Sequence, residues 1–186
     1  MLILISGAVG AGKSSVASIL VRQHGIDRVS SGDYLRTLAV KQGLEIDRKS
    51  LQLLGDQLDE NTDYSWLLDD VAVPLIGNSG SKKWLVDAVR KRKQVWNFRS
   101  RFEDVIHVHL SAPESLLRQR YISRLVASGM DSGGAEIDYE RAVVHPNEVE
   151  ARSLSQVADL VFDTSSVPPE EIAAVIGGGS AESSFT

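Results

Sequence analysis

Short apolar runs rich in branched residues alternate along the chain with longer stretches whose apolar residues recur at helical spacing. The runs are residues 2 to 5, 84 to 86, 105 to 110 and 160 to 162, and a weaker one lies at residues 27 to 30. The spacing between the runs is that of helices with one buried face. Because strands that alternate with helices are typical of a parallel sheet covered by crossover helices, the pattern predicts an α/β fold.

Residues 33 to 82 form the longest interval between two predicted strands. The apolar spacing indicates several helices there, so we expect an insertion over one rim of the sheet. A last helix opens at Pro168 and Pro169 and ends at the glycines of residues 177 to 179. We therefore predict a single domain over residues 1–177, followed by a flexible tail over residues 178–186.

Composition narrows the class of protein. A chain of 186 residues, 42% of them hydrophobic, is long enough to bury one substantial core. The absence of cysteine excludes a disulfide scaffold and a thiolate metal site. A net charge of -5 and a pI near 5.4 argue against binding to nucleic acid polymers or to membranes. The N-terminal apolar run is too short for a signal peptide or a membrane span, so we expect a soluble, cytoplasmic protein.

The segment directly after the first run has the Walker A pattern. It reads Gly-Ala-Val-Gly-Ala-Gly-Lys-Ser at residues 7 to 14. Glycines let such a loop curl so that backbone N–H groups converge on phosphate oxygens, and the start of the following helix adds positive potential. A turn that merely joins a strand to a helix is the alternative, but it explains neither Lys13 nor Ser14.

The Walker A pattern assigns a role to each polar residue. Lys13 would neutralise charge that develops during phosphoryl transfer, and the Ser14 hydroxyl would coordinate Mg²⁺. Asp87 directly follows the run at residues 84 to 86, where a carboxylate can join the magnesium shell; its alternative role is a helix cap or turn. The residues predicted to bind the nucleotide in this loop are Gly7, Gly10, Ala11, Gly12, Lys13, Ser14 and Ser15.

Two arginines predict a second anion site. An acceptor that already carries a phosphate would require arginines that point into the cleft. Arg36 follows a predicted turn from strand to helix that Asp33 can cap, and Arg90 lies three residues after Asp87. We predict that Asp33, Arg36 and Arg90 bind the acceptor.

These segments resemble those of a known family. Residues 31 to 36, Ser-Gly-Asp-Tyr-Leu-Arg, look like the adenylate kinase segment Ser-Thr-Gly-Asp-Met-Leu-Arg, whose arginine grips the acceptor phosphate. Residues 87 to 90, Asp-Ala-Val-Arg, resemble that family's Asp-Gly-Phe-Pro-Arg, whose arginine does the same while its aspartate supports the magnesium shell. The resemblance to P-loop nucleoside monophosphate kinases implies a three-layer fold with a five-stranded parallel sheet in the strand order 2-3-1-4-5.

The resemblance extends to the helix before the family's lid. Arg120 and Arg124 are four positions apart on one helix face, and in the family the first such arginine stacks on the adenine of ATP while the second contacts its phosphates. A solvated basic face shared with Arg118 is the alternative. Arg141 follows the lid and matches a family arginine that contacts the transferred phosphoryl group. Its alternative is a surface helix residue paired with Asp138 or Glu140.

The resemblance runs from residue 1 to about residue 125, with an echo at residues 158 to 163. The lid would fall at about residues 125–140, where the chain is short, rich in glycine and free of cysteine, so no zinc-bearing lid is expected. Residues 87 to 90 lack the Gly and the Pro of the family segment, and residues 44 to 73 do not resemble adenylate kinase. AMP itself is therefore not predicted as the acceptor.

Together the motifs predict a kinase that uses ATP and Mg²⁺ to phosphorylate a small phosphorylated acceptor, foremost a nucleoside or deoxynucleoside monophosphate. Lys13, Arg120, Arg124 and Arg141 are the predicted catalytic residues, and Ser14 and Asp87 the predicted metal ligands. One alternative is a kinase that resembles dephospho-coenzyme A kinase, with Asp33 as the base toward a hydroxyl. A non-kinase ATP-binding switch is the second alternative. A monomer or a homodimer is expected.

Two further sets of residues are assigned structural roles. His107 and His109 alternate with apolar residues in one predicted strand, so we expect them to be packed or hydrogen-bonded on one face and not catalytic. Asp56, Asp59 and Asp63 form an acidic run that could meet an acceptor. An exposed helix face is the favoured interpretation of that run.

Overall fold

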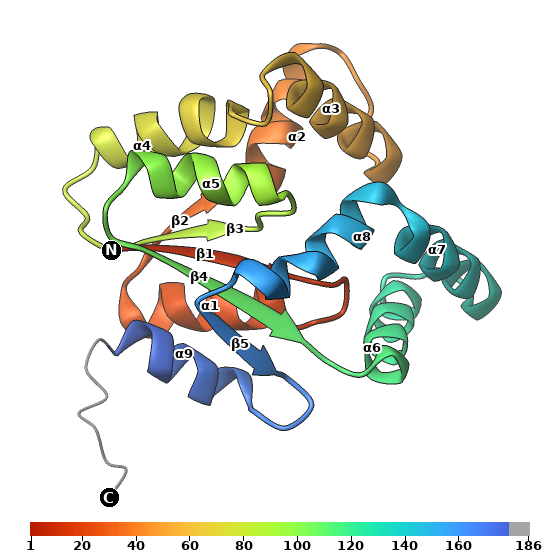
Figure 1. Cartoon of the computed structure of the whole chain (residues 1–186). Coiled ribbons are helices and arrows are strands. Elements are labelled where there is room, and N and C mark those ends of the chain that lie inside the picture. The colour runs from red at the N-terminus through yellow and green to blue at the C-terminus, as the bar shows by residue number, and fades with distance from the viewer. Residues whose placement is uncertain (179–186) are drawn as a thin grey trace, which may run out of the picture.

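The computed structural model describes residues 1–178 and forms three layers around a parallel sheet (Figure 1). The sheet has the strand order β2-β3-β1-β4-β5, which confirms the predicted fold and order. Its strands are β1 (Leu2–Gly7), β2 (Asp27–Ser30), β3 (Trp84–Asp87), β4 (Val105–Ser111) and β5 (Leu160–Asp163).

The central strand β1 is buried along its whole length. It pairs with β3 on one side, where Ile3 lies opposite Leu85, and with β4 on the other, where Ile3 lies opposite Ile106. A parallel strand with helices over both faces has no solvent-facing side, which is why this run is apolar at consecutive positions and does not alternate.

Helices cover both faces of the sheet. They are α1 (Lys13–His24), α2 (Ser31–Lys41), α3 (Arg48–Asn61), the π-helical η1 (Leu67–Ala72), α4 (Val73–Gly77), α5 (Arg92–Arg101), α6 (Glu114–Ala127), α7 (Ser132–Val144), α8 (Pro146–Ser153), the 3-10 helix η2 (Leu154–Val157) and α9 (Pro169–Gly177). Helices α1 and α9 lie on one face, and α4 and α5 lie on the other (Figure 1).

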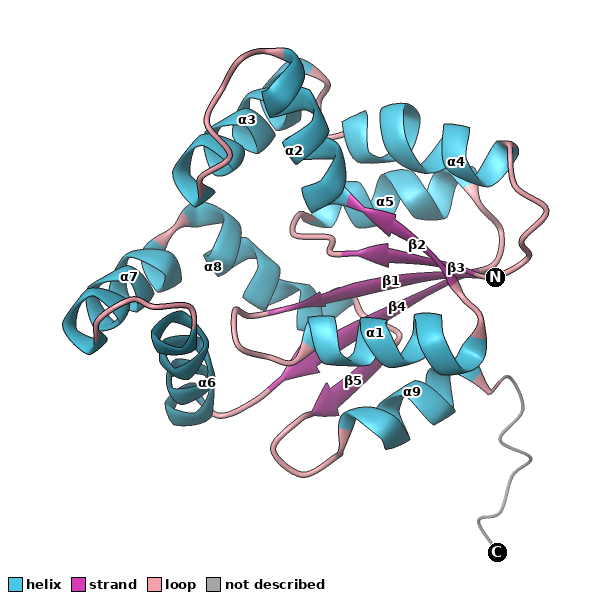
Figure 2. Cartoon of the chain, turned by 180° about the vertical axis from the view of Figure 1, so that it is seen from behind, coloured by secondary structure: helices cyan, strands magenta, loops and turns pink. Residues whose placement is uncertain are grey.

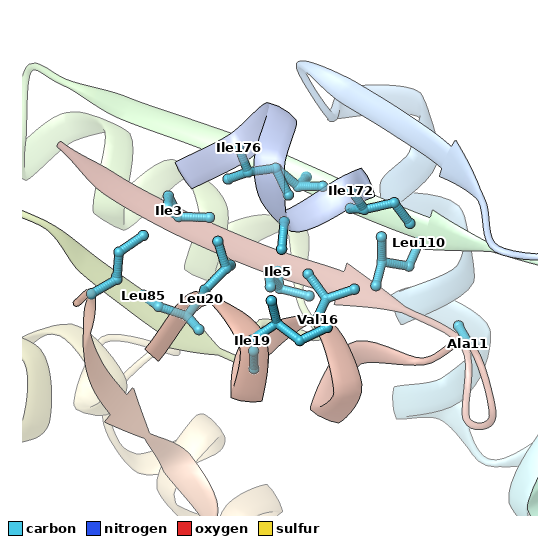
Figure 3. Close-up of a cluster of buried hydrophobic side chains, with 14 of the residues drawn as sticks. Ile3, Ile5, Ala11, Val16, Ile19, Leu20, Leu85, Leu110, Ile172 and Ile176 are labelled. Atoms are coloured by element: carbon cyan, nitrogen blue, oxygen red, sulfur yellow. The ribbon is translucent and has the colours of Figure 1, made fainter. Parts of the chain in front are cut away.

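The core has two parts, one on each face of the sheet. Ile3 and Ile5 of β1 face α1 and α9, and they pack with Leu20 and Ile172 in the cluster shown in Figure 3. The intervening residues of β1, such as Leu4, face the opposite way into a second cluster formed with η1 and α5. Because successive side chains of a strand point to opposite faces, one apolar strand joins the two clusters.

The predicted insertion, residues 33 to 82, contains most of α2, α3, η1 and α4. The predicted lid, residues 125–140, falls on the end of α6 and on α7. Gly133 and Gly134 lie in the first turn of α7 because the Asp131 side chain caps that helix, accepting a hydrogen bond from Gly134 N at 2.9 Å. The division into insertion and lid stays a prediction, and the predicted tail, apart from Gly178, lies outside the described residues.

Within residues 1–178, no helix has both the length and the apolar character needed to cross a bilayer.

Candidate active site

A cavity of about 990 Å³ lies at the carboxyl edge of the sheet. In Figure 2 the strands point toward the space between α2 and α3 on one side and α6 and α8 on the other. Most of the residues predicted to act at the site line this one cavity: residues 10 to 15, Arg36, Asp87, Arg90, Arg120 and Arg124. Gly7, Asp33 and Arg141 are not among its lining residues.

The loop between β1 and α1 depends on glycine at two close approaches. A Cβ added to Gly7 would lie 2.2 Å from the Leu110 carbonyl oxygen, and one added to Gly10 would lie 2.5 Å from that of Leu117. Both glycines also have positive φ, at 139° and 80°. The loop is therefore pressed against β4 and α6, and no side-chain cap satisfies the start of α1 at Gly12. An uncapped helix start beside a curled loop suits an anion.

Lys13 is half-buried beside this loop. Its Nζ donates hydrogen bonds to the carbonyl oxygens of Gly7 at 2.7 Å and of Ala8 at 2.8 Å. Burial lowers the pKa of Lys13 to about 8, and the positive charge of Arg90 adds to the effect, whereas the carboxylates of Glu148 and Asp87 oppose it.

Asp87 and Ser14 provide the oxygens that could face a magnesium ion. Asp87 is 9% exposed, and its Oδ2 lies 2.8 Å from Nη2 of Arg28, which also lines the cavity. Among the described residues, no group of three or more His, Cys, Asp or Glu side chains could hold a metal ion. One hydroxyl and one carboxylate fit Mg²⁺, which takes oxygen ligands and usually completes its shell with water and substrate phosphates.

Arg120 and Arg124 of α6 reach the cavity by different means. Arg120 donates from Nη1 to Thr164 Oγ1 and from Nη2 to the Thr164 carbonyl oxygen, both at 2.8 Å, so the loop after β5 fixes its guanidinium. Arg124 is exposed and lies over the Tyr121 ring, 5.0 Å from its centroid. Arg118 pairs instead with Glu136 at 2.5 Å and does not line the cavity.

Arg36 and Arg90, which also line the cavity, project from α2 and from the loop after β3. The guanidinium of Arg36 lies 3.4 Å from Asp33 Oδ1, a contact on an exposed surface. Gly32 leaves room for it, because a Cβ there would lie 3.0 Å from Arg36 Nη1. Asp33 lines a separate, smaller cavity of about 400 Å³, and Arg141 is exposed on α7.

Sequence reasoning missed Glu148, which closes the cavity from α8. This carboxylate is 8% exposed, and its Oε1 accepts from the backbone N–H of Val9 at 2.9 Å and from Arg152 Nε at 3.1 Å. Arg152 Nη1 also donates to Glu114 Oε2 at 2.6 Å, and Tyr139 donates to Glu114 Oε1 at 2.5 Å. The phosphate loop, α6, α7 and α8 are thus joined by one chain of charged hydrogen bonds.

A family model described as AAA domain matches residues 6–137, which is more than half of the chain. The chain belongs to this family of P-loop kinases. A UPF0200 protein of Thermococcus kodakarensis is 30% identical over 135 residues, or 69% of each chain. A cytidylate kinase of Haloquadratum walsbyi is 39% identical over 66 residues, and an adenylate kinase of Photorhabdus laumondii is 44% identical over 54 residues.

The matches to these two named kinases cover only 33% and 25% of those proteins. Among solved structures, the Thermus thermophilus protein TT1252 has a TM-score of 0.60 at 19% identity, covering 96% of this chain and 95% of that one. Shikimate kinase from Acinetobacter baumannii has a TM-score of 0.53 at 18% identity, covering 94% and 89%. At these identities the likeness shows the fold. The P-loop kinase family also confirms the expected enzyme class, a phosphotransferase.

The sequence favoured an exposed helix face for the acidic run Asp56, Asp59 and Asp63, and this interpretation is wrong for Asp59. Asp59 is 7% exposed and lines the cavity instead of facing solvent. Its Oδ1 accepts hydrogen bonds from Trp66 Nε1 at 2.7 Å and from Gln94 Nε2 at 3.3 Å. The helical spacing of α3 alone could not show this, because the donors are Trp66, which directly precedes η1, and Gln94 of α5.

The two histidines of β4 are packed and hydrogen-bonded, as expected. Both lie against Ser6 Oγ, which is 2.7 Å from His107 Nε2 and 2.9 Å from His109 Nδ1. Burial lowers the pKa of each to about 4, so both rings are neutral at neutral pH.

Proposed function

We propose that this chain transfers the γ-phosphoryl group of ATP to the phosphate of a nucleoside or deoxynucleoside monophosphate. The observation that carries the proposal is the meeting of two anion-binding groups on one cavity. The first is the loop after β1 with Lys13, and the second is the arginine pair Arg36 and Arg90. Relatives named cytidylate kinase and adenylate kinase support the choice of acceptor class.

On the donor side, backbone N–H groups of the loop and of the start of α1 would bind the phosphates of ATP. Lys13 would exchange its contacts with the loop carbonyls for phosphate oxygens, and Arg120 and Arg124 would balance the remaining charge. Ser14 and Asp87 would hold Mg²⁺, which supplies electrostatic stabilisation of the transferring phosphoryl group when bound. We propose that α7 and the end of α6 serve as the lid that excludes water from this end.

On the acceptor side, Arg36 and Arg90 would fix the acceptor phosphate in line with the γ-phosphoryl group. Because a phosphate oxygen is already a nucleophile, no side chain needs to remove a proton, and positioning accounts for most of the catalysis. Helices α2 and α3 and segment η1 would form the acceptor pocket of the predicted insertion.

The alternatives are less well supported. A hydroxyl acceptor with Asp33 as base requires Asp33 at the reacting atoms, whereas its carboxylate faces Arg36 and lines the smaller cavity. A pure ATP-dependent switch has no use for a second arginine pair on the nucleotide cavity.

ADP formation across a panel of acceptors tests the proposal. We expect turnover with nucleoside monophosphates and none with nucleosides or coenzyme precursors. Lys13→Ala should lower turnover by about 100-fold or more without unfolding the protein, since the residue faces the cavity, whereas Lys41→Ala on the exposed end of α2 should not. Turnover only with hydroxyl acceptors, or full activity of a folded Lys13→Ala variant, would refute the proposal.

A further inference from the structure

The acceptor side of the cavity contains a buried carboxylate that the proposed transfer does not use. Asp59 of α3 is 7% exposed and lines the cavity together with Trp66, Gln94 and Leu67. Burying a carboxylate costs free energy, so hydrogen bonds from neighbouring groups or from a ligand must offset that cost.

Gln94 is fully oriented by its neighbours. Its Oε1 accepts from the backbone N–H of Arg90 at 3.0 Å and of Lys91 at 3.3 Å, which turns its Nε2 toward Asp59. The amide therefore joins the backbone of the phosphate-binding Arg90 directly to the Asp59 carboxylate. Gln94 thus lies between the backbone of Arg90 and the carboxylate of Asp59 in the lining of the cavity.

The Asp59 carboxylate keeps an acceptor for a ligand. Within residues 1–178, both of the hydrogen bonds that it accepts, from Trp66 and Gln94, go to Oδ1. A carboxylate can accept about four hydrogen bonds in total, so Oδ2 retains its capacity. It can accept hydrogen bonds but, when ionised, cannot donate one.

Apolar side chains also line the cavity, together with Gln52. Leu35, Leu51 and Leu67 line it with the Trp66 ring, and Tyr34 stacks on that ring from outside the cavity at 5.6 Å between centroids. Apolar side chains beside one placed acceptor suit a flat ring that carries a hydrogen-bond donor at its edge.

We propose that Asp59 is a specificity-determining residue, which selects monophosphates whose base carries an exocyclic amino group in place of an oxo group. The amino group would donate to Asp59 Oδ2 while the phosphate rests on Arg36 and Arg90. An oxo group at the same position would place its oxygen against Asp59 Oδ2, and neither atom could donate a hydrogen bond to the other. The buried carboxylate would then lack a partner at Oδ2, which discriminates more strongly between bases than the loss of one favourable contact would. This inference rests on the proposed function.

Matched acceptors test it. Cytidine and uridine monophosphates differ in amino against oxo at one ring carbon, as do adenosine and inosine monophosphates. We expect kcat/KM to favour the amino member of at least one pair by about tenfold or more. In Asp59→Asn the remaining amide oxygen can still accept from Trp66 and Gln94, while an N–H₂ replaces Oδ2. In that variant the ratio of kcat/KM between the amino and the oxo acceptor should fall by about tenfold or invert.

Asp63→Asn is the matched control, because Asp63 is exposed, pairs with Lys93 and does not line the cavity. It should keep the wild-type ratio. Equal kcat/KM within both pairs in the wild type, or an unchanged ratio in a folded Asp59→Asn variant, would overturn the inference while leaving the proposed function intact. Absence of turnover with every monophosphate would instead refute the proposed function, and the inference with it.

Discussion

At the scale of single residues, the Glu148 carboxylate partly offsets the effects that lower the pKa of Lys13. Its carboxylate accepts from the Val9 N–H of the phosphate loop and raises the pKa of Lys13 against the lowering by burial and by Arg90. A negative group beside a phosphate site is unfavourable for an anion. Its hydrogen bonds to Val9 and Arg152 are the physical reason that it is tolerated there.

Replacing Glu148 by Gln should therefore move the pH dependence of turnover. Gln keeps an oxygen for the Val9 N–H but removes the charge, so the pKa of Lys13 should fall below its value of about 8. Since the transfer requires protonated Lys13, the alkaline limb of the kcat profile should move to lower pH by about one unit or less. Glu140→Gln, the same charge change on the exposed side of α7, should leave the profile in place. An unmoved limb in Glu148→Gln would contradict this account of Lys13.

The histidine pair predicts acid sensitivity of the fold. In the folded state the pKa of His107 and of His109 is about 4, against an ordinary value of 6.5. Between these values the unfolded chain binds more protons than the folded one, so the free energy of unfolding should fall as pH decreases from about 6.5 to about 4. The loss should reach about 3 kcal/mol or more across this range.

Denaturant unfolding at a series of pH values measures this loss of unfolding free energy. A variant with Asn at both histidine positions should show a shallower decline through the same range. An equal decline in wild type and variant would assign the acid sensitivity to other groups.

Some residues of the candidate site can be recognised from the sequence, and others cannot. Lys13, Ser14 and the glycines are recognisable because the loop is contiguous, so order and spacing suffice. Glu148 and Asp59 are not, since Glu148 meets a partner 139 positions away and Asp59 is bonded by donors from two other elements. Their roles depend on the packing of whole helices, which one sequence does not display.

At the scale of elements, the phosphate loop is shaped by what it packs against. Gly10 has a φ of 80° and lies against the carbonyl of Leu117 on α6, the helix that also carries Arg120. The loop and this arginine-bearing helix are thus in direct backbone contact, which leaves no space for a side chain.

Gly10→Ala should cost both stability and nucleotide affinity, because its Cβ would lie 2.5 Å from the Leu117 oxygen. Gly43→Ala is the matched control, since Gly43 has a φ of 69° with nothing within 4 Å of an added Cβ. The control should lose about 1 kcal/mol of unfolding free energy from backbone strain alone, and Gly10→Ala should lose more. Denaturant unfolding and equilibrium ATP binding measure the two effects. Equal losses of unfolding free energy in the two variants would show that α6 can move to accommodate the added Cβ at little cost.

The elements themselves were predictable to different degrees. Four of the five strands follow from apolar runs, because a parallel strand covered on both faces needs no alternation. The remaining strand, β2, reads Asp-Arg-Val-Ser and is predicted mainly from the motif that follows it. The start of helix α7 was not foreseen, because Gly133 and Gly134 suggest a loop while the capping Asp131 starts a helix there. The π-helical form of η1 also has no signal in the spacing of its residues.

At the scale of the whole molecule, the cavity is enclosed by parts of the chain that are distant in sequence. Asp56 of α3 accepts a hydrogen bond from Asn147 Nδ2 of α8 at 2.5 Å, and His145 Nε2 lies 3.9 Å from the same carboxylate. Figures 1 and 2 both show α3 beside the start of α8. Helices α3 and α8 therefore meet beside the cavity, and this contact would help to exclude water during the proposed transfer.

The most direct test of the whole account follows a labelled γ-phosphoryl group from ATP to a nucleoside monophosphate, in the wild type and in the double variant Arg36→Ala/Arg90→Ala. The account predicts a labelled diphosphate product in the wild type. It predicts that the double variant, with ATP affinity little changed, transfers the label about 100-fold or more slowly. Transfer at the wild-type rate in the double variant, or release of the label only as free phosphate in both proteins, would contradict it.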